Sequence, residues 1–243
     1  MRDERRDQLA EALTAVRARI DAAAHAAGRD PAGIKLLAVT KTFPASDAAL
    51  LTDLGMLDLG ENREQEGSAK AAELAELRPD TQVRWHLMGR LQRNKTRSAV
   101  GWADEIQSVD SERLANALEH AVALAWAAHD RHGPLDVLAQ VSIDGDPNRG
   151  GCPIENLPRL ADVLARSGEL SLLGLMAIAP LSMAPEAAFE RLAKAADRLR
   201  NDHPHATELS AGMSGDLEQA IRYGSTCVRV GTALLGARGL ASP

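Results

Sequence analysis

The segment Lys35-Leu-Leu-Ala-Val-Thr-Lys41 is a short apolar run with a β-branched centre, and it ends in a lysine. Its apolar residues would face both sides of a strand, which is typical of a strand buried on both faces in a parallel α/β sheet. Proteins of this class place their chemistry at the carboxyl ends of such strands. Lys41 would lie at that edge, where its amine can attack an aldehyde and form an imine. A lysine that only reaches to water or pairs with a carboxylate is the alternative.

Strand-like stretches recur along the chain, and helical stretches separate them. We expect strands at residues 35–41, 57–61, 83–88, 105–109, 136–143, 172–178, 208–212 and 227–230. This alternation predicts parallel βαβ units, and eight of them in 243 residues predict one closed (β/α)8 barrel of the TIM type. An open doubly wound sheet is the alternative, but no G-x-G-x-x-G follows the first strand and no G-x-x-x-x-G-K-[ST] occurs.

Residues 2–27 precede the first strand and have apolar residues three or four positions apart, as a helix requires. Gly28 would end this helix. We expect an extra element that either closes one end of the barrel or packs outside it. The predicted organisation is one domain over 1–243, with the leading helix at 1–28 and the barrel at 35–236.

Composition bounds the protein class. The net charge of -6 is mild and the basic residues form no long block, so we expect no nucleic-acid partner. The two cysteines, Cys152 and Cys227, lie far apart, which suits a reducing compartment. We see neither a signal peptide nor an apolar run long enough to span a membrane. We therefore expect a cytoplasmic, monomeric protein that does not bind membranes.

The turns after the last two expected strands have the composition of a phosphate site. Gly212-Met-Ser-Gly-Asp216 follows the seventh strand, and Ser214 is placed to cap a helix over 215–222. Gly231-Thr232 follows the eighth strand and again combines a glycine with a hydroxyl. Phosphate often binds at these two loops in (β/α)8 barrels, so we expect it here. Two ordinary turns are the alternative.

Arg229 lies between two valines in the eighth strand. If its side chain points into the barrel, the guanidinium needs an acceptor, because it cannot lose its charge. An ion pair with Glu61 or Glu208 and a contact with a ligand atom are both open. An imine-forming lysine, a phosphate site and this arginine together suggest pyridoxal 5'-phosphate (PLP), with Arg229 at the ring nitrogen.

The motifs that carry chemistry resemble those of the PLP homeostasis proteins, which are PLP-binding barrels related to the N-terminal domain of alanine racemase (PLP fold type III). The motifs are Ala38-Val-Thr-Lys-Thr42, Gly60-Glu-Asn62, Trp85-His-Leu-Met-Gly-Arg-Leu-Gln-Arg-Asn-Lys95, Gly174-Leu-Met-Ala-Ile-Ala-Pro180 and the run from Met213 to Thr232. The resemblance is continuous from about Lys35 to Gly236.

The resemblance implies a role for each site residue. Lys41 would hold PLP as an imine, and Asn62 would lie beside the cofactor. Ser214, Gly231 and Thr232 would hold the phosphate, Arg229 would meet the pyridine nitrogen and Met213 would line the pocket. The family is regarded as carriers or regulators of the PLP pool with no established reaction, and apo PLP-dependent enzymes are possible partners. The segment from Ser142 to Gly151 departs from the family pattern, near Arg149 among other positions, and Ala211 and Leu235 also differ.

Two enzyme classes compete with this interpretation. A PLP-dependent racemase needs an acid or base on each face of the substrate, and the only tyrosine, Tyr223, lies between the last two strands. A Schiff-base aldolase would have its lysine on the sixth strand, which ends in Met176-Ala-Ile-Ala-Pro180. Metal binding at His203-Pro-His205 or His129-x-x-His132 is disfavoured, because neither pair has further ligands at site spacing. We also expect a basic surface at 90–97, as solvated loop or as a docking surface for an apo-enzyme.

Overall fold

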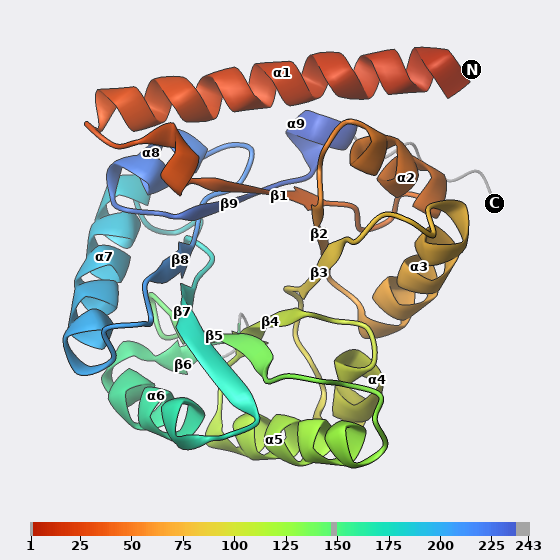
Figure 1. The fold of residues 1–243 in the computed structure, drawn as a ribbon. Coiled ribbons are helices and arrows are strands. Elements are labelled where there is room, and N and C mark those ends of the chain that lie inside the picture. The colour runs from red at the N-terminus through yellow and green to blue at the C-terminus, as the bar shows by residue number, and fades with distance from the viewer. Residues whose placement is uncertain (1, 147–149, 237–243) are drawn as a thin grey trace.

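The fold is an eight-stranded parallel barrel inside a ring of helices, as predicted from the sequence (Figure 1). The computed structural model describes residues 2–146 and 150–236. The barrel strands are β1 (Lys35–Val39), β2 (Asp58–Glu61), β3 (Arg84–Leu87), β4 (Glu105–Val109), β5 (Leu135–Ser142), β7 (Leu170–Met176), β8 (Glu208–Ser210) and β9 (Cys227–Val230). They join in the order β4-β3-β2-β1-β9-β8-β7-β5, and the pairing of β4 with β5 closes the barrel. A short strand, β6 (Cys152–Pro153), adds to β5.

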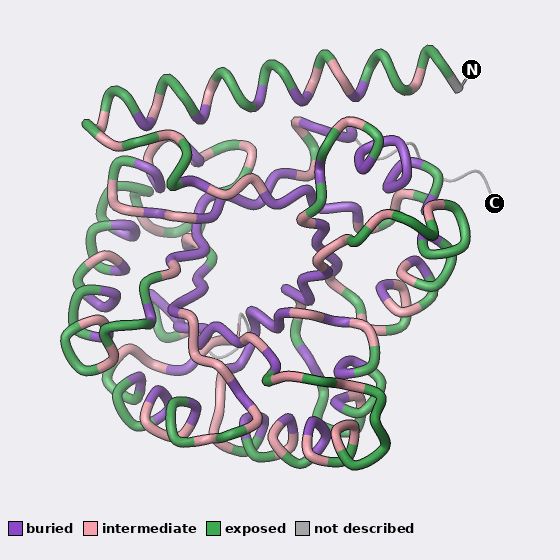
Figure 2. Tube along the Cα trace, viewed as in Figure 1, coloured by how far each residue is buried: buried purple, intermediate pink, exposed green. Residues whose placement is uncertain are grey.

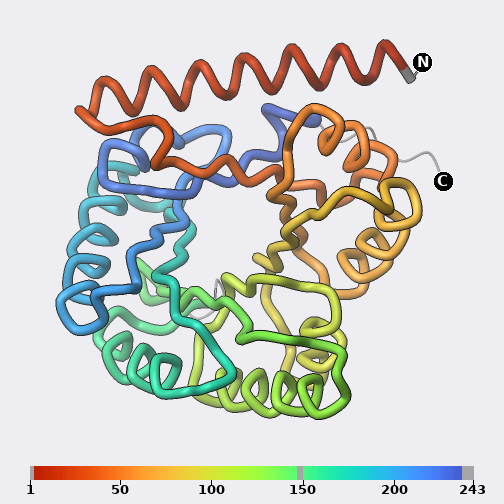
Figure 3. The backbone as a smooth tube through the Cα atoms, in the orientation of Figure 1, coloured from red at the N-terminus to blue at the C-terminus, as the bar shows by residue number. Residues whose placement is uncertain are grey.

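The chain runs once around the barrel, so β1 and β9 from opposite ends of the sequence lie side by side (Figure 3). The outer helices are α2 (Ala45–Asp53), α3 (Glu64–Leu77), α4 (Thr96–Val100), α5 (Glu112–Ala127), α6 (Leu157–Arg166), α7 (Pro185–Asp202), α8 (Leu217–Arg222) and α9 (Thr232–Leu235). Short 3-10 turns lie at Pro31–Gly33, Arg93–Lys95 and Ile154–Asn156. The strands and the inward faces of the helices are buried, and the outward faces are exposed (Figure 2). This is the layering that βαβ units produce.

The leading helix, α1 (Arg2–Ala26), packs outside the barrel rather than across one end of it (Figure 1). One stripe of apolar residues faces α2, α8 and α9, and it includes Leu9, Leu13, Val16 and Ile20. Two arginines add ion pairs along its length: Arg5 lies 2.6 Å from Asp47, and Arg19 lies 2.7 Å from Glu218. Of the two placements that the sequence left open, the structure therefore has the outer one.

Charged side chains fill the end of the barrel where the strands begin. His86 is fully buried, with its Nε2 2.8 Å from Asp58 and its Nδ1 3.2 Å from Glu105. The Arg84 guanidinium lies 3.1 Å from the second carboxylate oxygen of Glu105, and the Lys35 ammonium lies 3.4 Å from a carboxylate oxygen of Glu208. Burial alone would raise the pKa of Glu105, but the hydrogen bond and charge of His86, with Lys35 and Arg84, hold this pKa at about 2.

The depressed pKa of Glu105 predicts acid sensitivity. Its usual value is 4.5, so the stabilisation is complete above about pH 4.5 and is lost as the pH falls toward about 2. We expect the free energy of unfolding to fall by about 3 kcal/mol over this window from Glu105 alone. Urea unfolding at a series of pH values, with Glu105→Gln beside the wild type, measures this. Glu105→Gln should give a flatter curve, while Glu76→Gln at an exposed position should not; parallel curves for all three proteins would contradict the assignment.

Candidate functional site

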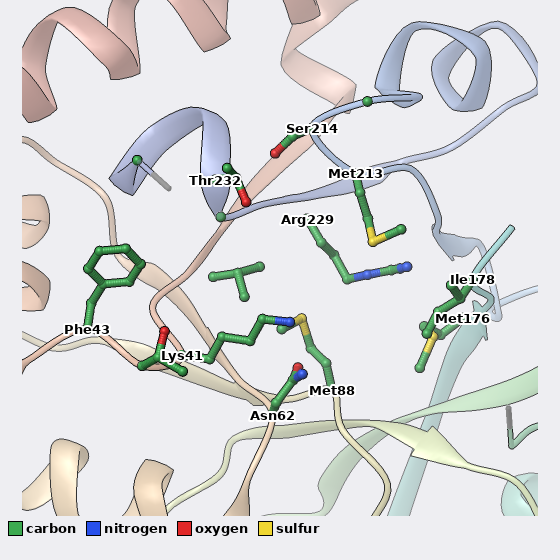
Figure 4. A pocket seen from close by; sticks show the side chains of 15 residues that line it. Lys41, Phe43, Asn62, Met88, Met176, Ile178, Met213, Ser214, Arg229 and Thr232 are labelled. Carbon is green, nitrogen blue, oxygen red and sulfur yellow. The ribbon is translucent and has the colours of Figure 1, made fainter. Parts of the chain in front are cut away.

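A cavity of about 320 Å³ opens at the carboxyl ends of the strands (Figure 4). All seven residues predicted from the sequence to bind a cofactor line it: Lys41, Asn62, Met213, Ser214, Arg229, Gly231 and Thr232. Lys41 and Arg229 extend into the cavity from the ends of β1 and β9, which are neighbours in the barrel. The closure of the barrel therefore brings together groups that are almost 190 positions apart in the chain, as the predicted fold required.

The backbone on both sides of Lys41 is held by side chains of α3. The Lys70 ammonium donates a 2.7 Å hydrogen bond to the carbonyl oxygen of Thr40, and the Thr42 N–H donates to a carboxylate oxygen of Glu66. Thr42 has a φ of 68°, a left-handed conformation that a β-branched residue rarely adopts. Such strain persists only where the surroundings enforce it. The two contacts therefore fix the turn that aims Lys41 into the cavity.

A buried ion pair lies behind this turn. Lys70 approaches Glu61 to 2.5 Å, and the Thr40 hydroxyl donates a 2.6 Å hydrogen bond to the same carboxylate oxygen. Both Lys70 and Glu61 are almost completely buried. Burial raises the pKa of Glu61 above its usual value, against the opposing effect of the hydrogen bonds from Lys70 and Thr40. Lys70 thus connects a buried carboxylate to the backbone beside Lys41.

The two loops predicted to bind phosphate meet at one side of the cavity. The expectation that Ser214 caps the following helix is wrong. Helix α8 begins at Leu217, and Asp216 precedes it and accepts a 2.6 Å hydrogen bond from the Met213 N–H. The Ser214 hydroxyl instead accepts a 3.3 Å hydrogen bond from the Ala233 N–H in the other loop. In the described part of the chain, the N–H groups of Ser214 and Gly215 donate to no protein acceptor. They are therefore available to an anion at the cavity wall.

A glycine is required where the first of these loops leaves β8. Gly212 has a φ of 91°, and a Cβ at this position would lie 2.5 Å from the Cβ of Ala220. Helix α1 supports the same loop from outside, because Arg19 donates a 3.0 Å hydrogen bond to the Ser214 carbonyl oxygen. Arg5 similarly donates a 3.0 Å hydrogen bond to the Leu235 carbonyl oxygen in α9. The leading helix thus contacts the loop after β8 and the helix α9 that follows β9.

Arg229 is buried and forms neither of the ion pairs that the sequence left open. Its two terminal nitrogens donate hydrogen bonds of 2.8 Å, one to the Ser210 hydroxyl and one to the Ala177 carbonyl oxygen. Glu61 pairs with Lys70 and Glu208 with Lys35, so within the described residues no carboxylate neutralises Arg229 directly. Burial lowers the pKa of Arg229 below its usual value. A guanidinium in this state favours an acceptor from a ligand in the cavity.

The cavity also contains residues that sequence reasoning did not select. Phe43, Met88, Met176 and Ile178 supply an apolar lining, which suits a flat ring. Met88 and Met176 lie in two of the motifs that resemble the PLP homeostasis proteins, near the ends of expected strands. This position was the sequence signal that could have identified them as lining residues. Residues 147–149 of the loop after β5, including Arg149, lie outside the described residues.

Other candidate sites lie elsewhere or are not formed. In the described ranges, no three or more His, Cys, Asp and Glu side chains are grouped so that they could hold a metal ion. The described helices include none that is long and apolar enough to cross a membrane. The basic surface at 90–97 borders a polar groove of about 1020 Å³ that also includes Arg113. This groove follows β3 and β4, at the same end of the barrel as the cavity.

Removal of the Lys70 ammonium tests the buried pair beside Lys41. Lys70→Met leaves Glu61 charged and unpaired in the interior, and we expect a loss of about 3–5 kcal/mol in the free energy of unfolding. Lys194→Met is the matched control, because Lys194 forms an exposed pair with Glu190 on α7. The control should lose less than about 1 kcal/mol. Chemical denaturation measures both. Adding Glu61→Gln to Lys70→Met should recover part of the loss, and equal losses in Lys70→Met and the control would refute the role of the pair.

This chain is similar to known proteins in both sequence and structure. A family model described as alanine racemase, N-terminal domain, matches residues 12–239. A pyridoxal phosphate homeostasis protein of Mycobacterium tuberculosis (strain ATCC 25618 / H37Rv) is 51% identical over 249 residues, covering 99% of this chain and 96% of the relative. The Escherichia coli K12 protein of the same name is 39% identical over 239 residues, covering 96% and 97%.

Several solved structures have a fold similar to that of this chain. PipY of Synechococcus elongatus PCC7942, solved with PLP bound, has a TM-score of 0.77 and 34% identity, covering 94% of this chain and 100% of PipY. An unknown protein from Bifidobacterium adolescentis has a TM-score of 0.87 and 33% identity, with 96% of each chain covered. Alanine racemase from Corynebacterium glutamicum shares the fold at a TM-score of 0.68 and 14% identity, covering 98% of this chain and 64% of the racemase.

Proposed function

This chain belongs to the alanine racemase N-terminal domain family and, within it, to the PLP homeostasis proteins, as its motifs predicted, and on this premise we propose that it binds PLP through an imine with Lys41. The observation that carries the proposal is the combination in one cavity of three features. They are Lys41, a buried guanidinium that pairs with no carboxylate of the described residues, and two neighbouring loops, of which one has N–H groups that donate to no described acceptor. These groups fit the aldehyde, the ring nitrogen and the phosphate of PLP. When bound, PLP supplies an electrophilic carbonyl carbon to amines.

Each residue of the cavity has a separate role in the proposed binding. Ser214, Gly231 and Thr232 hold the phosphate, with the N–H groups of Ser214 and Gly215 as further donors. Asn62 lies beside the cofactor ring, and Met213 covers it. Arg229 donates to the ring nitrogen and, being permanently charged, leaves that nitrogen unprotonated. A ring in this state withdraws electrons weakly, which favours holding PLP over using it.

We further propose that the protein carries or regulates PLP in the cytoplasm and has no robust activity of its own. Two-base racemisation needs a second acid or base opposite the lysine. Tyr223 lies at the end of α8 and packs against the hydrophobic core, and it is not among the residues that line the cavity. A weak PLP-dependent racemase is the second candidate, favoured by the family model that the chain matches.

Absorbance spectroscopy with borohydride reduction tests the proposed cofactor site. Purified protein given PLP should show a band that reduction converts to a stable adduct on the peptide containing Lys41. Lys41→Ala should bind PLP more weakly and give no adduct, because the amine is absent. Lys35→Ala is the control, since Lys35 begins β1, the strand that leads to Lys41, but pairs with Glu208 at the far end of the barrel. A wild-type protein that takes up no PLP, or an adduct retained in Lys41→Ala, would overturn the proposal.

The basic surface at 90–97 is proposed to contact an apo PLP-dependent enzyme during transfer. Arg90, Arg93, Arg97 and Arg113 are exposed, and the groove opens at the same end of the barrel as the cavity. A cationic surface speeds encounter with an anionic partner.

Charge reversal at Arg93→Glu/Lys95→Glu should slow transfer of PLP to an apo aminotransferase by about tenfold at low salt, and less at high salt. Arg191→Glu/Arg198→Glu, at exposed positions of α7, changes the net charge equally and should leave the rate closer to that of the wild type. Transfer is followed by the activity regained by the aminotransferase. Equal rates for the two double variants would refute the docking surface.

A further inference from the structure

A chain of hydrogen bonds runs from Arg229 through the barrel interior. Arg229 donates to the Ser210 hydroxyl over 2.8 Å, and that hydroxyl donates to the Gln107 side-chain oxygen over 2.7 Å. The Gln107 amide then donates to a carboxylate oxygen of Glu105 over 2.8 Å. Each of these four residues is at most 5% exposed. The residues come from β9, β8 and β4, so the chain crosses the barrel rather than following one strand.

The order of donors and acceptors in this chain is fixed. A guanidinium has donors only, so Ser210 accepts from Arg229. The charged Glu105 carboxylate accepts only, so the Gln107 amide nitrogen faces it and the amide oxygen faces the Ser210 hydroxyl. The Gln107 oxygen then accepts the proton of that hydroxyl. In the reverse orientation, the amide oxygen would face a carboxylate. The rotation of the Gln107 amide therefore depends on Glu105.

The hydrogen-bond chain ends at the carboxylate of Glu105, which is held by several donors. This carboxylate receives hydrogen bonds from Gln107 and from Arg84, and His86 lies 3.2 Å away. Although burial opposes ionisation, the hydrogen bond and charge of His86, with Lys35 and Arg84, keep the pKa of Glu105 at about 2, so it remains a charged acceptor at neutral pH. It is also the first carboxylate that the chain from Arg229 reaches. Arg229 is thus connected to a carboxylate only through two neutral side chains.

We infer that Ser210 and Gln107 are positioning residues that hold one terminal nitrogen of Arg229, and so direct the rest of the guanidinium to an aromatic-nitrogen acceptor in the cavity. The second terminal nitrogen is held by the Ala177 carbonyl oxygen. With two of its nitrogens fixed, the planar guanidinium has one orientation. A direct carboxylate partner would compete with a ligand for the same donors, and the indirect connection to Glu105 avoids this competition. The inference rests on the proposed binding of PLP.

Two ligands separate positioning from a purely structural role. PLP has the ring nitrogen, whereas its deaza analogue has a C–H group in that place and cannot accept from Arg229. In the wild type PLP should bind more tightly than the analogue. Ser210→Ala removes the first link, and Gln107→Met removes the second while keeping a side chain of similar length. Each variant should reduce the preference for PLP over the analogue by about tenfold, because a hydrogen bond from a charged donor loses its alignment.

Ser225→Ala is the matched control. Ser225 is also a fully buried serine, and its hydroxyl hydrogen bonds to carbonyl oxygens of Leu209, Ala211 and Cys227, next to the chain but outside it. We expect Ser225→Ala to lower the melting temperature without changing the ratio of the two Kd values. Because Ser210 and Gln107 act in series, the double variant should lose no more preference than Ser210→Ala alone.

The outcomes distinguish this inference from the proposed function. If the wild type binds no PLP, the proposed function fails. If the wild type binds PLP and both ligands weaken equally in Ser210→Ala and Gln107→Met, the two residues are only structural and the inference fails. If one of these two variants does not fold, the other still tests the inference, because each variant removes a different hydrogen bond of the chain. An unchanged Kd ratio in either folded variant overturns the inference.

Discussion

Burying charge inside an eight-stranded barrel is the constraint on which the rest of this structure depends. Unpaired charges in a protein interior cost several kcal/mol each, so every one must find a partner. At the end where the strands begin, His86, Arg84 and Lys35 pair with four carboxylates, those of Asp58, Glu105, Asp136 and Glu208. Above them lie the neutral side chains of Gln107 and Ser210, and above these lies Arg229. The interior thus passes from balanced charge to a cation whose remaining acceptor must come from the cavity.

The same constraint shapes the outer side of the cavity. Glu61 is fully buried at the end of β2, and Lys70 from α3 reaches it. Because that ammonium also binds the Thr40 carbonyl oxygen, neutralising one charge fixes the backbone before Lys41. Glu66, one helical turn before Lys70, accepts a hydrogen bond from the N–H of Thr42, the residue after Lys41. The strained turn at Thr42 is therefore maintained by contacts that the fold needs for a different reason, which is how local strain persists at a functional site.

The sequence predicted those features that repeat with a period or lie in a motif. Eight apolar stretches between helical stretches predicted the barrel, and its closure places Lys41 beside Arg229. The prediction that Ser214 caps a helix over 215–222 was wrong because helix α8 begins at Leu217, and a shift of a few residues at a helix start cannot be read from composition. The partners of Arg229 and Thr40 depend on strand register and on the rotation of α3. Neither quantity has a local signal in the sequence.

The indirect connection of Arg229 to Glu105 also supports the proposal that this barrel holds PLP rather than using it in catalysis. A carboxylate beside the ring nitrogen would share a proton with it and strengthen the ring as an electron sink. Here the nearest carboxylate along the hydrogen-bond chain is Glu105, and Gln107 and Ser210 stand between it and the arginine. Neither intervening group is acidic enough to pass a proton toward the cavity at neutral pH. The hydrogen-bond chain therefore transmits orientation, and it keeps acidity away from the proposed cofactor.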